Sequence, residues 1–324
     1  MKIIQDVKFV VFGCRFNTRR FLLNLFEKKL FPQLVITLDP EMVMESYCGY
    51  ENLLPLCAKY NVPVYLCEKY SLQDNDLVEI KKLGKNFDIG LSVGWQRLIP
   101  NDLLNYFKYG VFGMHGSHLP LPKGRGCSPQ VWSIIKGGKD YYAHIFQYAA
   151  GVDDGKIFYR EVFDITPNDL AVTLQIKSQM VFNAQIETLF KQINEGEVQL
   201  KEQDKSIKAT YFPKRTPEDG LINWNQSADQ IVNFVRAQKT PYPGAYTYLG
   251  AQKIKIEEVC IFDTRLEFLR RIPCGEIIDM LEGLDFIVST KDHPLWVRKW
   301  YGADRVFKGN KFSNSSQEEL NEGI

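Results

Sequence analysis

The sequence of 324 residues has no long apolar segment, no CxxC motif and no excess of either charge. A membrane-spanning helix needs about 20 consecutive apolar residues, and no segment approaches that length, so we expect no contact with a membrane. Forty Lys and Arg residues against 39 Asp and Glu residues leave a net charge of +1, which creates no overall attraction to nucleic acid. The first residues lack the apolar stretch and cleavage site of a signal peptide. We therefore expect a cytoplasmic protein.

Two further kinds of site are excluded by what is missing. The seven cysteines are odd in number and scattered, which predicts free thiols in a reducing compartment, with neither a disulfide framework nor a zinc site. The turn at residues 13–17, GCRFN, lacks the GxGxxG pattern of a dinucleotide site. We therefore predict that the protein binds neither a metal nor NAD.

Short apolar runs alternate with helical patterns through the first part of the chain. This alternation predicts an α/β fold with a doubly wound, mostly parallel sheet, which binds ligands at the carboxyl ends of its strands. A longer helical pattern follows over residues 169–193. The predicted strands are residues 8–13, 33–38, 62–66, 87–93, 111–114, 142–149 and 156–165, and the predicted shorter helices are residues 18–30, 51–59, 76–83, 98–107 and 128–135.

A polar stretch at residues 196–208 has the composition of a linker. Beyond it, five short β-like runs and one helix near residues 227–238 predict a small barrel or sandwich. We therefore divide the chain into an N-terminal catalytic domain over residues 1–204, a β-rich, barrel-like domain over residues 205–312, and a frayed tail over residues 313–324.

The segment at residues 110–130, GVFGMHGSHLPLPKGRGCSPQ, carries the strongest functional signal. It places His115 in a glycine-rich turn after an apolar run, and two prolines and an RG pair then fix the path of the loop. A second polar turn, GVDDG at residues 151–155, can bring Asp153 back to this histidine. A histidine and an aspartate at adjacent strand ends predict proton-transfer chemistry.

These motifs resemble those of the 10-formyltetrahydrofolate-dependent formyltransferases, whose doubly wound domain carries an N-x-H...S-x-LP-x-x-RG...P loop and a later D-x-G turn. The segments WQRLIPNDL at residues 95–103 and ATYFPKRTPEDGLINW at residues 209–224 also look like parts of this family, and the resemblance covers about residues 7–306. It implies that 10-formyltetrahydrofolate supplies a formyl group to an amine. His115 would handle the proton, and Asp153 would orient the imidazole and stabilise its charged form.

The chain departs from the family pattern at Gly113, where the family has an asparagine two residues before the histidine. Glycine offers no side-chain amide to the formyl oxygen, and losing one such donor costs roughly a hundredfold or more in rate. Three explanations are open. A neighbour such as Ser117, His118 or His144 supplies the donor, the backbone N–H groups of the turn supply it, or the protein is catalytically impaired.

The remaining candidate residues concern binding. By resemblance, the folate pterin would lie between a first group of residues, Val93, Gly94 and Trp95, and a second group in the Asp153 turn, Gly151, Val152 and Asp154. Arg15 and Asn17 follow the first predicted strand, where they are candidates to meet the diphosphate or sugar of the acceptor. Lys123 and Arg125 are candidates for phosphate contacts.

Ordinary structural roles compete with several of these assignments. Arg15 can equally be a surface charge, and we favour Arg125 as a brace that bonds to backbone carbonyls of its own loop. Asp154 is interpreted as a solvated turn residue. His118 can be a surface hydrogen-bonding group, and His144 can be a core histidine with its hydrogen bonds satisfied.

The distribution of charged residues along the chain bears on which amine would receive the formyl group. A tRNA-binding enzyme should show basic surface, yet residues 38–51 carry only acidic charges, and charges nearly balance from residue 205 onward. The GWxxLIP segment also looks like the sugar-modifying branch, so we favour a nucleotide-linked amino-deoxy sugar for a surface polysaccharide. The alternatives are a methionyl-tRNA formyltransferase, a hydrolase that releases formate, and a non-catalytic folate- or sugar-nucleotide-binding homologue. Exposed aromatic residues on the C-terminal domain would suit a homodimer contact.

Overall fold

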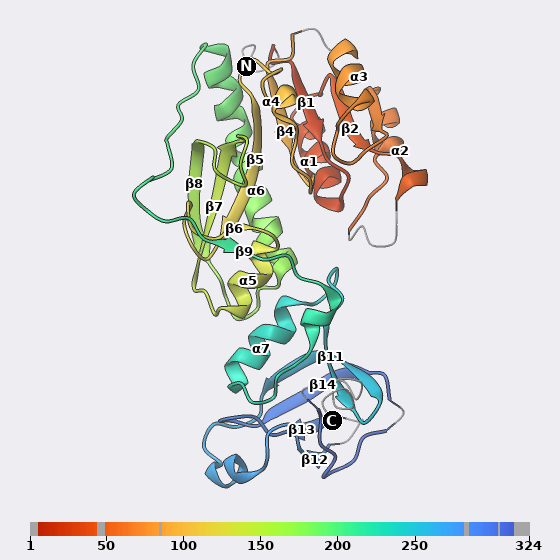
Figure 1. Ribbon diagram of the computed structural model, residues 1–324, viewed down its shortest axis with the longest axis vertical. Coiled ribbons are helices and arrows are strands. Elements are labelled where there is room, and N and C mark those ends of the chain that lie inside the picture. Colours follow the sequence, from red (N-terminus) through yellow and green to blue (C-terminus); the bar gives the residue numbers. More distant parts are fainter. Residues whose placement is uncertain (1–5, 44–48, 84–85, 282–284, 304, 314–324) are drawn as a thin grey trace. The chain divides into compact units, whose positions relative to one another are not determined.

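The computed structural model describes residues 6–43, 49–83, 86–281, 285–303 and 305–313 (Figure 1). The chain divides into two compact units whose segments interleave along the sequence. The first unit holds the described residues up to Pro129, with Asp140–Asp164 and Gln175–Phe212, and the second holds Gln130–Lys139, Ile165–Leu174 and the described residues from Pro213 onward. Apart from Ser313, the predicted tail lies outside the described residues. The division at residues 204 and 205 stays a prediction.

A seven-stranded sheet forms the centre of the first unit, in the order β3-β2-β1-β4-β5-β7-β8. The first five strands in this order are parallel, and β7 and β8 are antiparallel to their neighbours. The doubly wound, mostly parallel sheet that the sequence predicts is therefore confirmed. Its strands are β1 Phe9–Phe12, β2 Leu34–Leu38, β3 Val64–Cys67, β4 Ile89–Ser92, β5 Val111–Ser117, β7 Asp140–Gln147 and β8 Ile157–Asp164.

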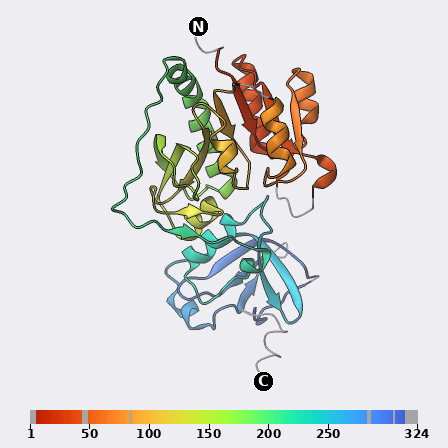
Figure 2. The same cartoon turned by 45° about the horizontal axis from the view of Figure 1, so that its top comes forward.

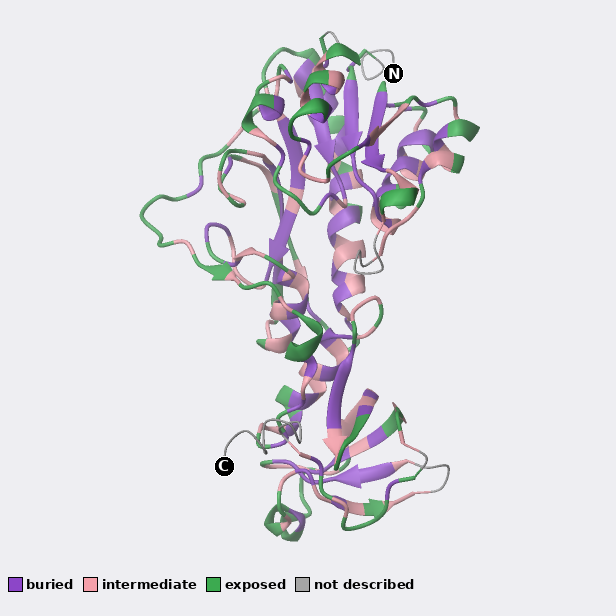
Figure 3. Ribbon diagram, turned by 45° about the vertical axis from the view of Figure 1, so that its right-hand side comes forward, coloured by how far each residue is buried: buried purple, intermediate pink, exposed green. Residues whose placement is uncertain are grey.

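Helices cover both faces of this sheet, and side chains alternate between the two faces along each strand. Phe9 and Val11 of β1 pack into one core with α1 and α6, whereas Val10 and Phe12 pack into a second core with α3 and α4. Every residue of the two central strands β1 and β4 is buried, and the centre of the sheet is accordingly purple in Figure 3. The helices are α1 Phe16–Glu27, α2 Leu54–Lys59, α3 Asn75–Leu83, α4 Asn101–Leu104 and α6 Ala171–Asn194, with a short 3-10 turn η1 at Pro40–Met42.

β5 is longer than the sequence predicts. It pairs with β4 only as far as Ser92 and Gly113, but it pairs with β7 from Phe112 to Ser117. The antiparallel partner therefore continues the strand past the point where the parallel ladder ends. The expectation that His115 lies in a turn is wrong, since it lies inside β5.

The second unit is built on a five-stranded antiparallel sheet in the order β10-β11-β14-β13-β12 (Figures 1 and 2). α7 packs against β11, and its first turn is capped by the Ser227 hydroxyl, which accepts the Gln230 N–H. Isolated bridges pair Ser313 with Tyr248 of β10 and Lys311 with Glu276, just before β12. One short segment thus contacts both edges of the sheet, which gives the sheet a barrel-like character. The elements are α5 Pro129–Ile135, η2 Pro217–Gly220, α7 Ala228–Ala237, β10 Ala245–Leu249, β11 Gln252–Ile261, η3 Glu267–Arg271, β12 Ile277–Met280, β13 Phe286–Val288 and β14 Leu295–Tyr301.

The predicted β-rich second domain is confirmed as a fold. Six cysteines in the described residues are free thiols, and Cys48 lies outside those residues. Among the helices that the structure describes, none is both long enough and apolar enough to pass through a lipid bilayer.

Candidate functional site

β5 presents the central histidine on one face of the sheet. Phe112 and Met114 pack against the core that contains α6. Because side chains alternate along a strand, Gly113, His115 and Ser117 face the opposite side. The site is therefore carried by the part of β5 that extends past β4, at the carboxyl edge of the parallel strands, where open α/β sheets bind ligands.

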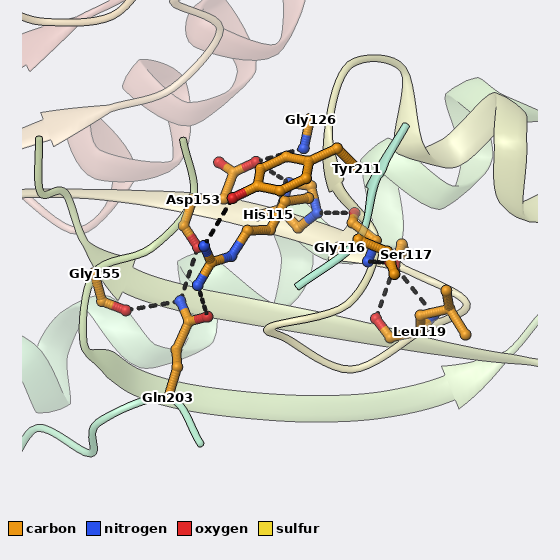
Figure 4. Close-up of polar contacts among 12 residues, drawn as sticks. His115, Gly116, Ser117, Leu119, Gly126, Asp153, Gly155, Gln203 and Tyr211 are labelled. Carbon is orange, nitrogen blue, oxygen red and sulfur yellow. Dashed lines mark hydrogen bonds and ion pairs between the residues drawn. The ribbon is translucent and has the colours of Figure 1, made fainter. Parts of the chain in front are cut away.

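His115 is buried and pairs with the half-buried Asp153 (Figure 4). The imidazole Nδ1 lies 3.2 Å from the Asp153 carboxylate, and Nε2 lies 2.7 Å from the carbonyl oxygen of Gly124. The same carboxylate accepts the backbone N–H of Gly126 at 2.9 Å. His115 is 7% exposed. The turn between β7 and β8 thus brings a carboxylate to the histidine, as the sequence spacing predicts, and both ring nitrogens face oxygen acceptors.

Gln203 supports this turn from a distant part of the chain. Its side-chain amide donates to the carbonyl oxygens of Asp153 at 2.8 Å and Gly155 at 2.9 Å, and its oxygen accepts from Arg125 at 2.6 Å. Arg125 also donates to the hydroxyl of Tyr211 at 3.2 Å. Arg125 is therefore a brace, although it bonds to side chains and not to backbone carbonyls as predicted. Sequence reasoning missed Gln203 because it lies in the polar stretch interpreted as a linker.

The polar side chains that follow His115 in the sequence, Ser117, His118 and Lys123, lie at the end of β5 and in the loop after it. The Ser117 hydroxyl donates to the Leu119 carbonyl at 2.7 Å and accepts the Leu119 N–H at 3.1 Å. His118 packs on Phe212, with ring centroids 5.8 Å apart, and Lys123 is exposed. The structure therefore engages Ser117 within its own loop and places His118 beside Phe212.

His144 lies beside His115 on the same face of the sheet, because the two residues are paired across β5 and β7. Its side chain is buried, and neither ring nitrogen has a hydrogen-bond partner among the described residues. Burial lowers the pKa of His144 to about 3, with further contributions from His115 and Arg160, so the ring is neutral at physiological pH. His144 is therefore a core histidine, which is one of the two roles that the sequence left open.

Tyr148 occupies the space next to Gly113. A Cβ atom at Gly113 would lie only 2.3 Å from the Tyr148 hydroxyl oxygen and 2.5 Å from two carbons of its ring. The residue that approaches Gly113 most closely is thus none of the three proposed from sequence. Gly113 pairs with Phe146 across β5 and β7, and Tyr148 lies two residues after Phe146. Only this pairing connects the tyrosine with Gly113, and it cannot be read from the sequence.

The first group of expected folate-binding residues, Val93, Gly94 and Trp95, lies beside Arg15 and Asn17 at the ends of β1 and β4. The Thr18 hydroxyl donates to the Val93 carbonyl at 2.5 Å, and a Cβ atom at Gly94 would lie 2.4 Å from the Asn17 amide oxygen and 3.2 Å from Cβ of Arg15. Arg15 is 8% exposed, so it is not the surface charge that the sequence left open.

Buried polar atoms at this edge lack a hydrogen-bond partner within the described residues. They include the indole Nε1 of Trp95 and the Nε of Arg15. The Trp95 ring packs edge-on against Tyr70, with centroids 4.7 Å apart, so it is held in place while its N–H remains available. Unpaired buried polar groups of this kind fit a site that is completed by a bound molecule.

The Asp153 turn itself is largely solvent-exposed. Asp154 is exposed, as expected for a solvated turn residue, Val152 is also exposed, and Gly151 is half-buried. A pocket of about 230 Å³ opens beside it, lined in part by Asp154, Arg125 and Gln203. No cluster of His, Cys, Asp or Glu side chains suited to a metal ion occurs in the part of the chain that the structure describes.

Known proteins with similar sequences or folds include formyltransferases. Residues 54–186 match the family model for formyl transferase, and residues 214–316 match the model for the formyl transferase C-terminal domain. A bifunctional polymyxin resistance protein, ArnA, of Wigglesworthia glossinidia brevipalpis is 36% identical over 204 residues. The match covers 61% of this chain and 29% of that protein, so the chain spans less than a third of this relative's length.

Solved structures share the fold at low sequence identity. An N-formyltransferase from Helicobacter canadensis, crystallised with folinic acid and dTDP-3-aminofucose, aligns with a TM-score of 0.62 at 17% identity, over 90% of this chain and 99% of its own. HypX from Aquifex aeolicus aligns with a TM-score of 0.63 at 16% identity, over 91% of this chain and 46% of its own. With both of its domain models matched in order along the sequence, the chain belongs to the formyltransferase family.

Proposed function

We propose that this protein is an N-formyltransferase that moves a formyl group from 10-formyltetrahydrofolate to the amine of a nucleotide-linked amino-deoxy sugar. The observation that carries the proposal is the contact of the buried His115 with Asp153 at the carboxyl edge of the parallel strands. Family membership and the sugar N-formyltransferases among the structural neighbours support the same reaction.

The reaction requires one proton to move between two nitrogens. The lone pair of the amine forms a bond to the formyl carbon while the carbonyl electrons move to oxygen. The carbonyl then re-forms, the bond from carbon to the folate nitrogen breaks, and that nitrogen takes up the proton that the amine has lost. His115 relays this proton, and Asp153 holds the imidazole in place and stabilises its charged form.

The Gly124 carbonyl gives the relay a defined starting geometry. Nε2 lies 2.7 Å from this carbonyl, and it accepts the proton of the amine only when the ring carries its hydrogen on Nδ1, toward Asp153, and Nε2 faces the amine N–H in place of the carbonyl. The pterin is assigned to the edge near Val93, Gly94 and Trp95, where the Trp95 N–H is available. Arg15 and Asn17, next to Gly94, are assigned to the diphosphate or sugar of the acceptor.

The proposal is tested with His115→Ala and Asp153→Asn. The wild-type protein is incubated with 10-formyltetrahydrofolate and a panel of dTDP- and UDP-linked amino sugars, and formylated product is measured by mass spectrometry. We expect each variant to lose on the order of 10²–10⁴ in kcat, the range supplied by a positioned acid or base. His293→Ala, in the second unit, serves as a histidine control and should keep full activity.

Each alternative has its own outcome in this assay. Free formate without product identifies a hydrolase, and formylation of methionyl-tRNA but of no sugar identifies the tRNA enzyme. Folate binding without turnover identifies a non-catalytic homologue. Wild-type turnover in His115→Ala would refute the assigned role of the histidine.

A further inference from the structure

We propose that the Tyr148 hydroxyl donates the hydrogen bond that stabilises the formyl oxygen during transfer. This inference rests on the proposed formyl transfer reaction, which needs a donor because negative charge develops on that oxygen when the amine attacks. It assigns a catalytic contact to a residue of this chain that the sequence motifs do not include.

The position of Tyr148 carries the argument. Its hydroxyl oxygen lies where the first side-chain atom of residue 113 would be, 2.3 Å from an ideal Cβ. Glycine at residue 113 is therefore required for the tyrosine to approach the strand so closely. The hydroxyl is held directly over β5, on the face that also carries His115.

The distance along β5 between Gly113, which lies under the Tyr148 hydroxyl, and His115 allows both side chains to contact one formyl group. Gly113 and His115 are two residues apart on one strand, which separates their Cα atoms by about 6.5–7 Å. A carbonyl group that lies between them can meet the imidazole on one side and the phenol on the other, since a reacting centre needs both partners at about 3 Å. Asp153, which holds His115, is also close enough to influence Tyr148 through its charge.

Tyr148 is held in place and remains protonated. Its backbone N–H donates to the Val111 carbonyl at 2.7 Å, and its ring packs against Phe146 with centroids 5.1 Å apart. Burial raises the pKa of Tyr148 to about 12, a hydrogen bond with the Ser92 hydroxyl opposes this rise, and the charge of Asp153 adds to it. The phenol therefore keeps its hydrogen at physiological pH and donates without losing it.

Other candidate donors are less well placed. The Ser117 hydroxyl is bonded at both ends to Leu119. His144 pairs with His115 and not with Gly113. The Ser92 hydroxyl lies at the position of β4 that pairs with Gly113, so it can assist Tyr148 from the neighbouring strand.

The first test is Tyr148→Phe, which removes the hydroxyl and keeps the ring. We expect kcat to fall on the order of 10²–10³-fold, the usual cost of losing one such donor, with little change in KM for the sugar. Tyr109→Phe is the matched control, because this half-buried tyrosine of the same unit bonds the Ile193 carbonyl at 3.2 Å and has no place in the site. It should keep wild-type kcat.

A binding measurement provides a readout without turnover. Affinities for a stable 10-formyl folate analogue and for its unformylated counterpart are compared by calorimetry. The wild-type protein should prefer the formylated analogue, and Tyr148→Phe should lose that preference while binding the unformylated analogue as tightly as before.

A side-chain exchange tests the geometry itself. Gly113→Asn alone should be inactive, because its side chain enters the space of the Tyr148 ring. Gly113→Asn combined with Tyr148→Ala vacates that space and supplies an amide donor, so it should recover at least tenfold in kcat over Tyr148→Ala.

The outcomes separate this inference from the proposed function. Turnover in the wild type with equal kcat and an equal formyl preference in Tyr148→Phe would overturn the role of Tyr148 and leave the formyltransferase activity standing. No product on any acceptor, together with a formyl preference that depends on Tyr148, would overturn the activity and leave the formyl contact standing. If Tyr148→Phe fails to fold by circular dichroism, recovery in the exchange variant supports the inference and its absence overturns it.

Discussion

Gln203 is the main support of the Asp153 turn, and replacing it with leucine should separate positioning from catalysis. Gln203→Leu keeps the approximate volume of the side chain and removes its three hydrogen bonds, two to the carbonyls of Asp153 and Gly155 and one to Arg125. The bonds to neutral carbonyls contribute roughly 1 kcal/mol each, and the bond to the guanidinium about 1.5–3 kcal/mol. Arg125 is only partly buried and regains some hydration, so we expect a net loss of about 3 kcal/mol in the free energy of unfolding.

The expected loss can be measured as a thermal shift. For a unit of this size, about 3 kcal/mol corresponds to a fall of roughly 6–12 °C in Tm. The loss of activity should exceed what the loss of stability explains, because a displacement of the Asp153 carboxylate by about 1 Å can lower the rate up to a hundredfold. We therefore expect kcat/KM for formyl transfer to fall by about 10–100-fold in Gln203→Leu.

Gln238→Leu provides a matched control from the second unit. Gln238 is similarly buried, accepts from Arg215 at 2.9 Å and donates to the Phe234 carbonyl at 3.0 Å. Its replacement should lower Tm without lowering kcat/KM. If Gln203→Leu behaves in the same way, with reduced Tm and unchanged kcat/KM, the role assigned to Gln203 in holding Asp153 is refuted.

Two further variants test other parts of the site. Ser117→Ala should destabilise the protein by about 1 kcal/mol and keep kcat within about threefold, because its hydroxyl serves Leu119; a hundredfold fall in kcat would return Ser117 to the catalytic groups. His144→Leu should flatten the acid side of the stability profile. Burial lowers the pKa of His144 from 6.5 to about 3, so the unfolded chain binds a proton that the folded protein does not, and unfolding free energy falls as pH drops below 6.5. This slope, up to about 1.4 kcal/mol per pH unit, should be present in urea denaturation of the wild type and absent in the variant; equal slopes would contradict a buried neutral His144.

The order of strands and helices was predictable because it depends on local patterns. The apolar run at residues 8–13 and the helical pattern at residues 18–30 correspond to β1 and α1, with ends shifted by a few residues. The encounter of His115 with Asp153 also followed from sequence, since a turn between two adjacent strands returns the chain to the neighbouring strand end.

What sequence reasoning missed depends on contacts between distant segments. The turn expected around His115 is a strand because β7 pairs with it, and nothing within residues 110–117 reveals that partner. Gln203 lies in a polar stretch whose composition resembles a linker, yet the side chain is 7% exposed. Tyr148 could be connected to Gly113 only through the register of β5 and β7, which a single sequence does not contain.

The extension of β5 past β4 has a consequence for how this enzyme type can diversify. The backbone of His115 is fixed by a ladder of backbone pairs, while residues 118–123, which follow the strand, belong to a connecting segment. Exchanges in this segment spare Gly124, Gly126 and Asp153, which contact the imidazole or its carboxylate partner, and can reshape the entrance for an acceptor while the strand pairing keeps the backbone of the histidine in place. Selectivity and reactivity can thus be altered one at a time, which makes the edge of this sheet a practical place to engineer new acceptors.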